Sequence, residues 1–149
     1  AMGGYTTAKK EIIEILRQRS RPYLFSNSLA PAIVGVSIKV FELLETDTSL
    51  RDQLEWNTNY FKQGMLKAGF DIIDGDSAIV PVMLYDAKLA QTMANELLKN
   101  GVYVIGFFFP VVPKEKARIR VQLSASHTKA HLDKALSTFE KVGKQLKVV

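Results

Sequence analysis

The second half of the chain alternates short runs of β-forming residues with helical segments, and this alternation constrains the fold more than any other feature. The runs and helices lie, in chain order, at 78–84, 86–100, 102–108, 117–124 and 128–146. Asp86 and Thr128 are suited to cap the two helices, and Gly101 to close the first of them. The pattern predicts an α+β domain in which helices cover one face of a small, mostly antiparallel sheet.

The first residues carry a helical pattern that ends near residue 19. Thr6 or Thr7 is expected to cap this helix, because a hydroxyl oxygen accepts from the free N–H groups of a first turn. Residues 20–29 show no period, and Pro22 predicts an extended conformation for Arg21. We therefore expect an ordered loop there.

Two further helices are predicted before the β-rich half, at residues 31–44 and 50–68. Pro31 fits the first turn of one, and Gly69 fits a left-handed residue after the other. The helix from Pro31 has so few polar positions that we expect it to be buried on most sides.

The formal net charge of +5 raises the question of a nucleic-acid partner. The densest basic stretch, residues 9–21, interleaves its cations with Glu11, Glu14 and aliphatic residues, which is typical of an amphipathic helix. The chain has no cysteine for a disulfide or a thiolate metal site, and no apolar run near the ~18 residues of a membrane span. We therefore expect a cytoplasmic protein that binds neither nucleic acid nor membrane.

Residues 117–124 alternate strictly between apolar and polar side chains. Arg118 and Arg120 share the polar face of this predicted strand. Taken alone, this pattern favours an ordinary half-solvated sheet whose arginines lie in water, so an anion site needs a further feature to support it. The preceding loop, residues 107–113, is apolar and bracketed by prolines, so we expect another domain or subunit to cover it. An arginine beside that cover would lie in a partly dry cleft, where a guanidinium pairs well with a carboxylate.

Two histidines, His127 and His131, lie four residues apart. Without cysteine or a second motif, they are interpreted as a residue at a helix start and a surface residue, and no metal site is predicted.

Four stretches of the chain resemble the glycine C-acetyltransferases, also called 2-amino-3-ketobutyrate CoA ligases, within the α-oxoamine synthase family. They are GGY at 3–5, RQRSRPYLFSNSLAP at 17–31, GFFFPVVP at 106–113 and ARIRVQLSA at 117–125. The resemblance runs from Gly3 to the end of the chain. It implies the C-terminal small domain of a fold-type-I enzyme that uses pyridoxal 5'-phosphate (PLP).

The resemblance also implies an activity and its site residues. The activity is acetyl transfer from acetyl-CoA to glycine, giving 2-amino-3-oxobutyrate and CoA in threonine breakdown, by a homodimer with its active sites at the subunit interface. Carried over by position, Arg120 holds the substrate carboxylate, with Arg118 in a supporting role. Ser26 and Asn27 match the residues that reach the phosphate of the PLP in the partner subunit.

The Schiff-base lysine of the family corresponds to a position before Gly3, so no catalytic residue is expected in this chain. Lys9 and Lys10 match no family motif. We expect the chain alone neither to catalyse the reaction nor to bind PLP. Residues 1–2 are interpreted as a cloning scar, 3–35 as a remnant of the PLP-binding large domain with the start of an interdomain helix, and 36–149 as the small domain.

Two alternative interpretations stay open. One is a sister α-oxoamine synthase that uses a longer acyl-CoA, of the 8-amino-7-oxononanoate synthase type. The other is a non-catalytic module that binds an acidic partner or nucleic acid through its basic strand.

Overall fold

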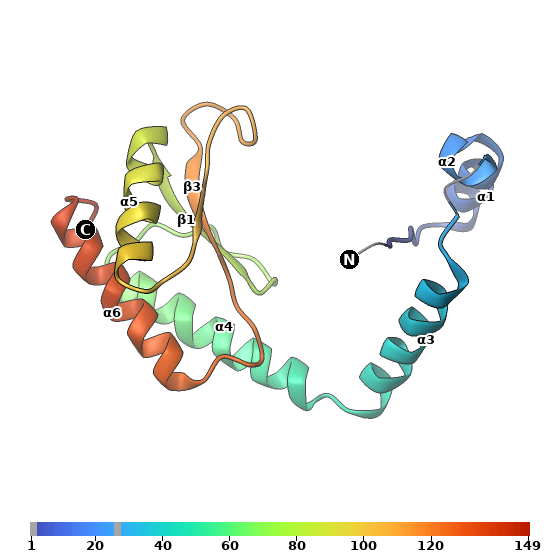
Figure 1. Cartoon of the computed structure of the whole chain (residues 1–149), viewed down its shortest axis with the longest axis horizontal. Coiled ribbons are helices and arrows are strands. Elements are labelled where there is room, and N and C mark those ends of the chain that lie inside the picture. Colours follow the sequence, from blue (N-terminus) through green and yellow to red (C-terminus); the bar gives the residue numbers. More distant parts are fainter. Residues whose placement is uncertain (1–2, 26–27) are drawn as a thin grey trace. The chain divides into compact units, whose positions relative to one another are not determined.

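The structure, a computed structural model, describes residues 3–25 and 28–149 and divides the chain into two compact units, residues 1–48 and 49–149 (Figure 1). The predicted cloning scar at residues 1–2 lies outside the described residues. The predicted domain boundary after residue 35 falls inside a helix of the first unit and stays a prediction.

The first unit contains α1 (Lys10–Arg19), α2 (Arg21–Leu24) and α3 (Pro31–Thr46). The predicted threonine cap of α1 is wrong. The residue before the helix is Lys9, whose φ is −57° and ψ is 147°, and whose carbonyl accepts from the N–H of Ile13 at 3.2 Å. No side chain caps α1 at Lys9.

The extended conformation predicted for Arg21 is also wrong, because Arg21 begins the short helix α2. Pro22 occupies the second position of this helix. A first-turn residue has no intrahelical partner for its N–H, so proline is tolerated there.

Pro31 begins α3, as predicted. The predicted burial of this helix is wrong for this chain, because no residue of α3 is buried. Val36 is 64% exposed and Leu43 is 58% exposed. The helix therefore presents an apolar surface that the described residues leave open to solvent.

The second unit contains three helices: α4 (Ser49–Lys67), α5 (Ala87–Lys99) and α6 (Lys129–Gln145). Their ends follow the predicted signals. Gly69, just beyond α4, has a φ of 92°, and Gly101, just beyond α5, has a φ of 83°. The carboxylate of Asp86 accepts from the N–H of Leu89 at 2.6 Å at the start of α5, and Thr128 caps α6.

None of the described helices combines the length and the apolar character that a membrane span requires.

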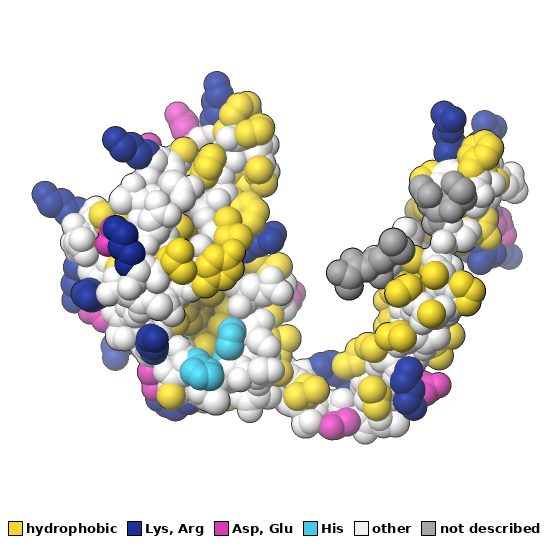
Figure 2. Space-filling model, in the orientation of Figure 1, with side chains coloured by type: hydrophobic (Ala, Val, Ile, Leu, Met, Phe, Trp, Pro, Cys, Tyr) yellow, Lys and Arg dark blue, Asp and Glu magenta, His cyan; other side chains and the backbone are white. Residues whose placement is uncertain are grey.

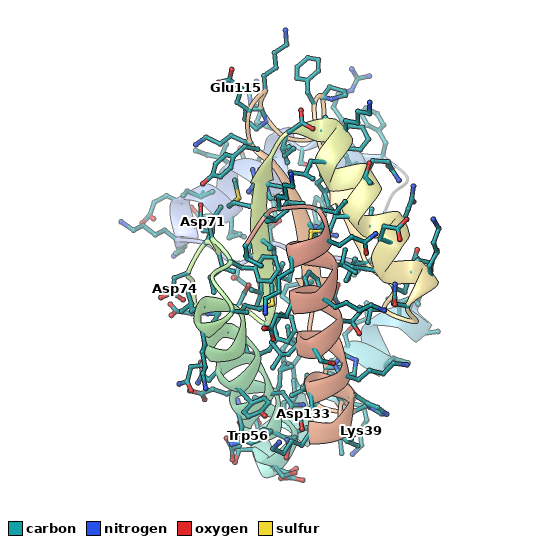
Figure 3. The ribbon with its side chains drawn as sticks, turned by 90° about the vertical axis from the view of Figure 1, so that its left-hand side faces the viewer. Lys39, Trp56, Asp71, Asp74, Glu115 and Asp133 are labelled. Carbon is teal, nitrogen blue, oxygen red and sulfur yellow. The ribbon has the colours of Figure 1, made fainter. Side chains whose placement is uncertain are left out.

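Three antiparallel strands form the sheet of this unit, in the order β1-β3-β2. They are β1 (Ile79–Tyr85), β2 (Ile105–Phe107) and β3 (Ala117–Gln122). All three helices lie on one side of the sheet (Figures 1 and 3). The predicted α+β architecture is confirmed.

Strand β2 is shorter than the predicted strand at 102–108. The N–H of Val102 donates to the carbonyl of Leu97 at 2.9 Å and so closes α5 instead of joining the sheet. At the other end, the carbonyl of Phe108 accepts from the N–H of Val111 and starts a turn. Helix closure and turn formation therefore take the outer residues of the predicted strand.

The core of the second unit lies between the helices and the sheet. Phe139 of α6 meets Phe61 and Phe70 edge to face, with ring centroids 6.0 and 5.9 Å apart. The largest fully buried side chains include Phe61, Met65, Val80, Val82, Met93, Leu97, Ile119, Phe139 and Val142. Gly106 brings β2 against α5, because a Cβ at this position would lie 3.1 Å from the carbonyl oxygen of Ala90.

A polar cluster joins α4 to α6 at one end of the core. The Tyr60 hydroxyl donates to Asp133 at 2.5 Å, and the Lys129 ammonium pairs with the same carboxylate at 2.7 Å. The bonds from Lys129 and then Tyr60 hold the pKa of Asp133 below its usual value, and Asp133 in turn raises the pKa of Lys129. Figure 3 shows Asp133 and Trp56, which stacks on Tyr60 at 5.1 Å, at the same end of these helices.

Candidate functional site: an arginine face on the sheet

Strand β3 is the central strand and displays the predicted alternation. Ala117, Ile119 and Val121 are buried toward the helices, with 8% exposure or less. On the opposite face, Arg118 is half-buried and Arg120 is exposed. The helix-free face of the sheet therefore carries the two arginines of the predicted anion site.

Arg120 has mostly apolar neighbours. Its backbone lies opposite Pro81 of β1 and Ile105 of β2, and these cross-strand partners share its face. Its guanidinium carbon lies 4.4 Å from the centre of the Phe107 ring. This distance is within the range of a cation–π contact. The aromatic ring supports the guanidinium and limits the directions in which its N–H groups point.

The two arginines differ in their bonding. Nε of Arg118 donates to the Lys116 carbonyl at 3.0 Å. Over residues 3–25 and 28–149, neither guanidinium forms an ion pair with a carboxylate. A guanidinium presents five N–H donors in a planar fork that matches a carboxylate. Arg120 is therefore the better placed of the two to bind a carboxylate.

The predicted apolar loop follows β2 directly. Phe109 is 57% exposed and Val111 is 71% exposed, and the Phe109–Pro110 peptide bond is cis. Figure 2 shows hydrophobic side chains over the sheet side of this unit. The structure thus leaves the loop uncovered, as expected of a surface that another domain or subunit would contact.

The two histidines lie at the start of α6, with ring centroids 6.4 Å apart. Nδ1 of His127 accepts from the N–H of Ser124 at 3.2 Å, and Nδ1 of His131 accepts from the N–H of Thr128 at 3.3 Å. Among the residues whose placement is described, no three histidine or carboxylate side chains are grouped to hold a metal ion.

The family model for aminotransferase class I and II matches residues 1–139. The chain belongs to this family. A 2-amino-3-ketobutyrate coenzyme A ligase from Escherichia coli K12 is 58% identical over all 149 residues, and the mitochondrial one from Homo sapiens is 49% identical over 144 residues. An 8-amino-7-oxononanoate synthase from Thermosipho melanesiensis is 46% identical over 148 residues. The chain spans 37%, 34% and 38% of these three relatives.

Solved structures of PLP enzymes share the fold of this aminotransferase-family chain. A high-resolution structure of SPT with PLP is 31% identical, with a TM-score of 0.83 over 95% of this chain and 36% of that one. A serine palmitoyltransferase from Sphingomonas wittichii is 28% identical, with a TM-score of 0.80 and the same two coverages. The predicted fold-type-I origin of the domain is confirmed.

Ser26 and Asn27, the predicted contacts to the PLP phosphate, lie outside the described residues. Their role stays a prediction. The donor chemistry fits a phosphate, because a hydroxyl and an amide both donate hydrogen bonds.

Sequence reasoning did not find the Phe107 ring beneath Arg120. The two residues are thirteen positions apart, and their contact depends on the antiparallel register in which Phe107 pairs with Arg118. The identities of Phe107 and Arg120 do not indicate that register. The sequence did indicate that the two strands are neighbours, because the proline-bracketed loop connects them.

Proposed function

We propose that this chain is the C-terminal part of a PLP-dependent acyltransferase that condenses glycine with acetyl-CoA to 2-amino-3-oxobutyrate and CoA. Relatives named 2-amino-3-ketobutyrate coenzyme A ligase, 58% and 49% identical, support this function. The observation that carries the proposal is the exposed Arg120 guanidinium, held on Phe107 and unpaired with any described carboxylate.

In this proposal Arg120 binds the carboxylate of glycine. A bidentate pair fixes two oxygens and so orients the α-carbon, whose proton must leave. The hydroxyl of Ser26 and the amide of Asn27 would hold the phosphate of PLP in the partner subunit. PLP, when bound, takes up electrons from the α-carbon and so makes this carbon reactive toward the thioester of acetyl-CoA.

The apolar loop after β2 supports a covered site. When another domain or subunit lies over Phe109 and Val111, water is removed from the neighbourhood of Arg120. Charge-assisted hydrogen bonds are stronger in such surroundings. We therefore propose that the complete protein is a homodimer. Its reaction would serve threonine breakdown in the cytoplasm.

A sister synthase with a longer acyl donor is the second candidate, supported by the 8-amino-7-oxononanoate synthase at 46% identity. Acyl length separates the two functions. The test is glycine-dependent CoA release by the protein from the complete reading frame, with acetyl-CoA and longer acyl-CoA donors in parallel. Release that is fastest with acetyl-CoA supports the first candidate. Release only with a longer donor supports the second, and no glycine-dependent release with any donor contradicts both.

A further inference from the structure

A hollow of about 420 Å³ opens in the second unit at the start of α6, apart from the arginines. Residues 101–104, the end of β3 and α6 enclose it. Its lining includes five buried apolar side chains: Phe61, Val121, Leu123, Leu132 and Phe139. Figure 2 shows the hollow directly above the two histidines, with hydrophobic side chains inside it. The hollow therefore has an apolar floor.

The hollow exists because β2 starts late. Residue 102 closes α5, and pairing with β3 begins only at Ile105, opposite Arg120. In an antiparallel sheet, the backbone N–H and C=O groups of successive residues point alternately toward the neighbouring strand on one side and on the other. The N–H of Leu123 donates to Ala78 at 2.9 Å on the β1 side, so the backbone groups of Gln122 face the β2 side. No described backbone group bonds them, and Gln122 lines the hollow.

Both histidines line the hollow. Because Nδ1 of each ring accepts a backbone N–H, from Ser124 or Thr128, that nitrogen carries no proton. In the neutral ring the proton is then on Nε2. The position of the His127 loop is fixed by the buried Asn57, which donates to the carbonyls of Ser124 and His127 at 2.8 and 2.9 Å.

Lys134 adds a positive charge. Its ammonium lies 3.1 Å from the position that a Cβ would take at Gly101, at the rim of the hollow. None of the described residues that line the hollow is an aspartate or a glutamate. The described lining thus combines Gln122, whose backbone N–H has no backbone partner, with two histidines and a lysine, and it contains no carboxylate to compete for them.

We propose that this hollow is a second ligand site, which binds a short monocarboxylate with an apolar chain. The apolar chain would lie on the floor formed by Phe61, Leu132 and Phe139. The carboxylate would accept from the imidazoles and pair with Lys134. A neutral ligand of the same shape would lose the ionic part of this interaction.

The test uses the whole chain labelled with ¹⁵N in its histidines, which are only two in number. Titration with 4-methylpentanoate is followed by the ring nitrogen resonances of His127 and His131. We expect both rings to shift, with a dissociation constant of about 1 mM for a ligand of this size. The uncharged 4-methylpentanamide, titrated in parallel, is expected to bind about fivefold more weakly.

The variant Lys134→Gln removes the rim charge from an exposed position and should weaken 4-methylpentanoate binding about fivefold. Lys141→Gln is the matched control, because Lys141 lies on the same helix, donates to Asn100 and does not line the hollow. The proposal is overturned if neither ring shifts at about 10 mM ligand, ten times the expected constant, or if the amide binds as tightly as the acid. The titration involves neither PLP nor catalysis, so its outcome is independent of the proposed acyltransferase function.

Discussion

Replacing Phe107 by leucine tests whether the aromatic ring positions the Arg120 guanidinium. The centroid distance of 4.4 Å places the charge within cation–π range of a half-buried ring. Such a contact contributes about 0.5–2 kcal/mol, and about 1.4 kcal/mol changes an equilibrium constant tenfold. The KM for glycine should therefore rise about twofold to thirtyfold in Phe107→Leu, while kcat changes much less, because the lost contact acts on carboxylate binding.

The assay is steady-state CoA release by the complete protein, with glycine varied and acetyl-CoA held at saturation. Phe107→Tyr keeps an aromatic face and should stay within about twofold of the parent KM. Urea unfolding of each variant separates lost stability from lost positioning. If Phe107→Leu keeps the parent KM for glycine, or lowers kcat while KM is unchanged, the positioning role of the ring is refuted.

Three further predictions concern stability, each measured by urea unfolding. Asn57→Ala should lower the free energy of unfolding by about 2–4 kcal/mol, because Asn57 is fully buried and donates to two carbonyls. A decrease below about 0.5 kcal/mol would contradict this. Gly106→Val should lower the free energy of unfolding by about 1–3 kcal/mol, because the added valine side chain meets the Ala90 carbonyl. An unchanged urea midpoint would exclude this close packing. Lys129 and Tyr60 lower the pKa of Asp133, so the stability from this cluster is present above the ordinary pKa of 3.8 and is lost as pH falls below it. The midpoint of Asp133→Asn should fall less steeply below about pH 4 than that of the parent, and equal slopes would count against the cluster.

The helix ends of the second unit were predictable because their signals are local. The Asp86 and Thr128 side chains bond N–H groups three residues further on, and the left-handed conformations of Gly69 and Gly101 need no distant partner. The inward face of β3 was equally predictable, because side chains in a strand alternate.

Two of the failures lie where two local signals compete. Pro22 restricts the residue before it, but it also suits a helix start, and the second effect decides at α2. Val102 belongs to a β-forming run, but closing α5 takes its N–H. At α3, the apolar pattern indicated burial that no described residue provides, because pattern reports what a helix prefers and not which partner is present.

Some features of the candidate site were predictable from the sequence and others were not. The strand pattern alone placed Arg120 on an open face, and the resemblance gave it a role. The ring beneath it required the register of β2 against β3, which depends on where the connecting loop turns. The donor-rich hollow was not predictable either, because it results from pairing that stops at Ile105.

The most direct test of the account is kcat/KM for glycine of the complete protein carrying Arg120→Gln, beside Arg118→Gln as the matched change on the same strand face. A bidentate pair contains two charge-assisted hydrogen bonds of about 1.5–3 kcal/mol each, so Arg120→Gln should lower kcat/KM about 10²- to 10⁴-fold. Arg118→Gln should lower it less than about tenfold, because Arg118 already donates to the Lys116 carbonyl. An Arg120→Gln variant within about twofold of the parent would contradict the assignment of Arg120 to the substrate carboxylate.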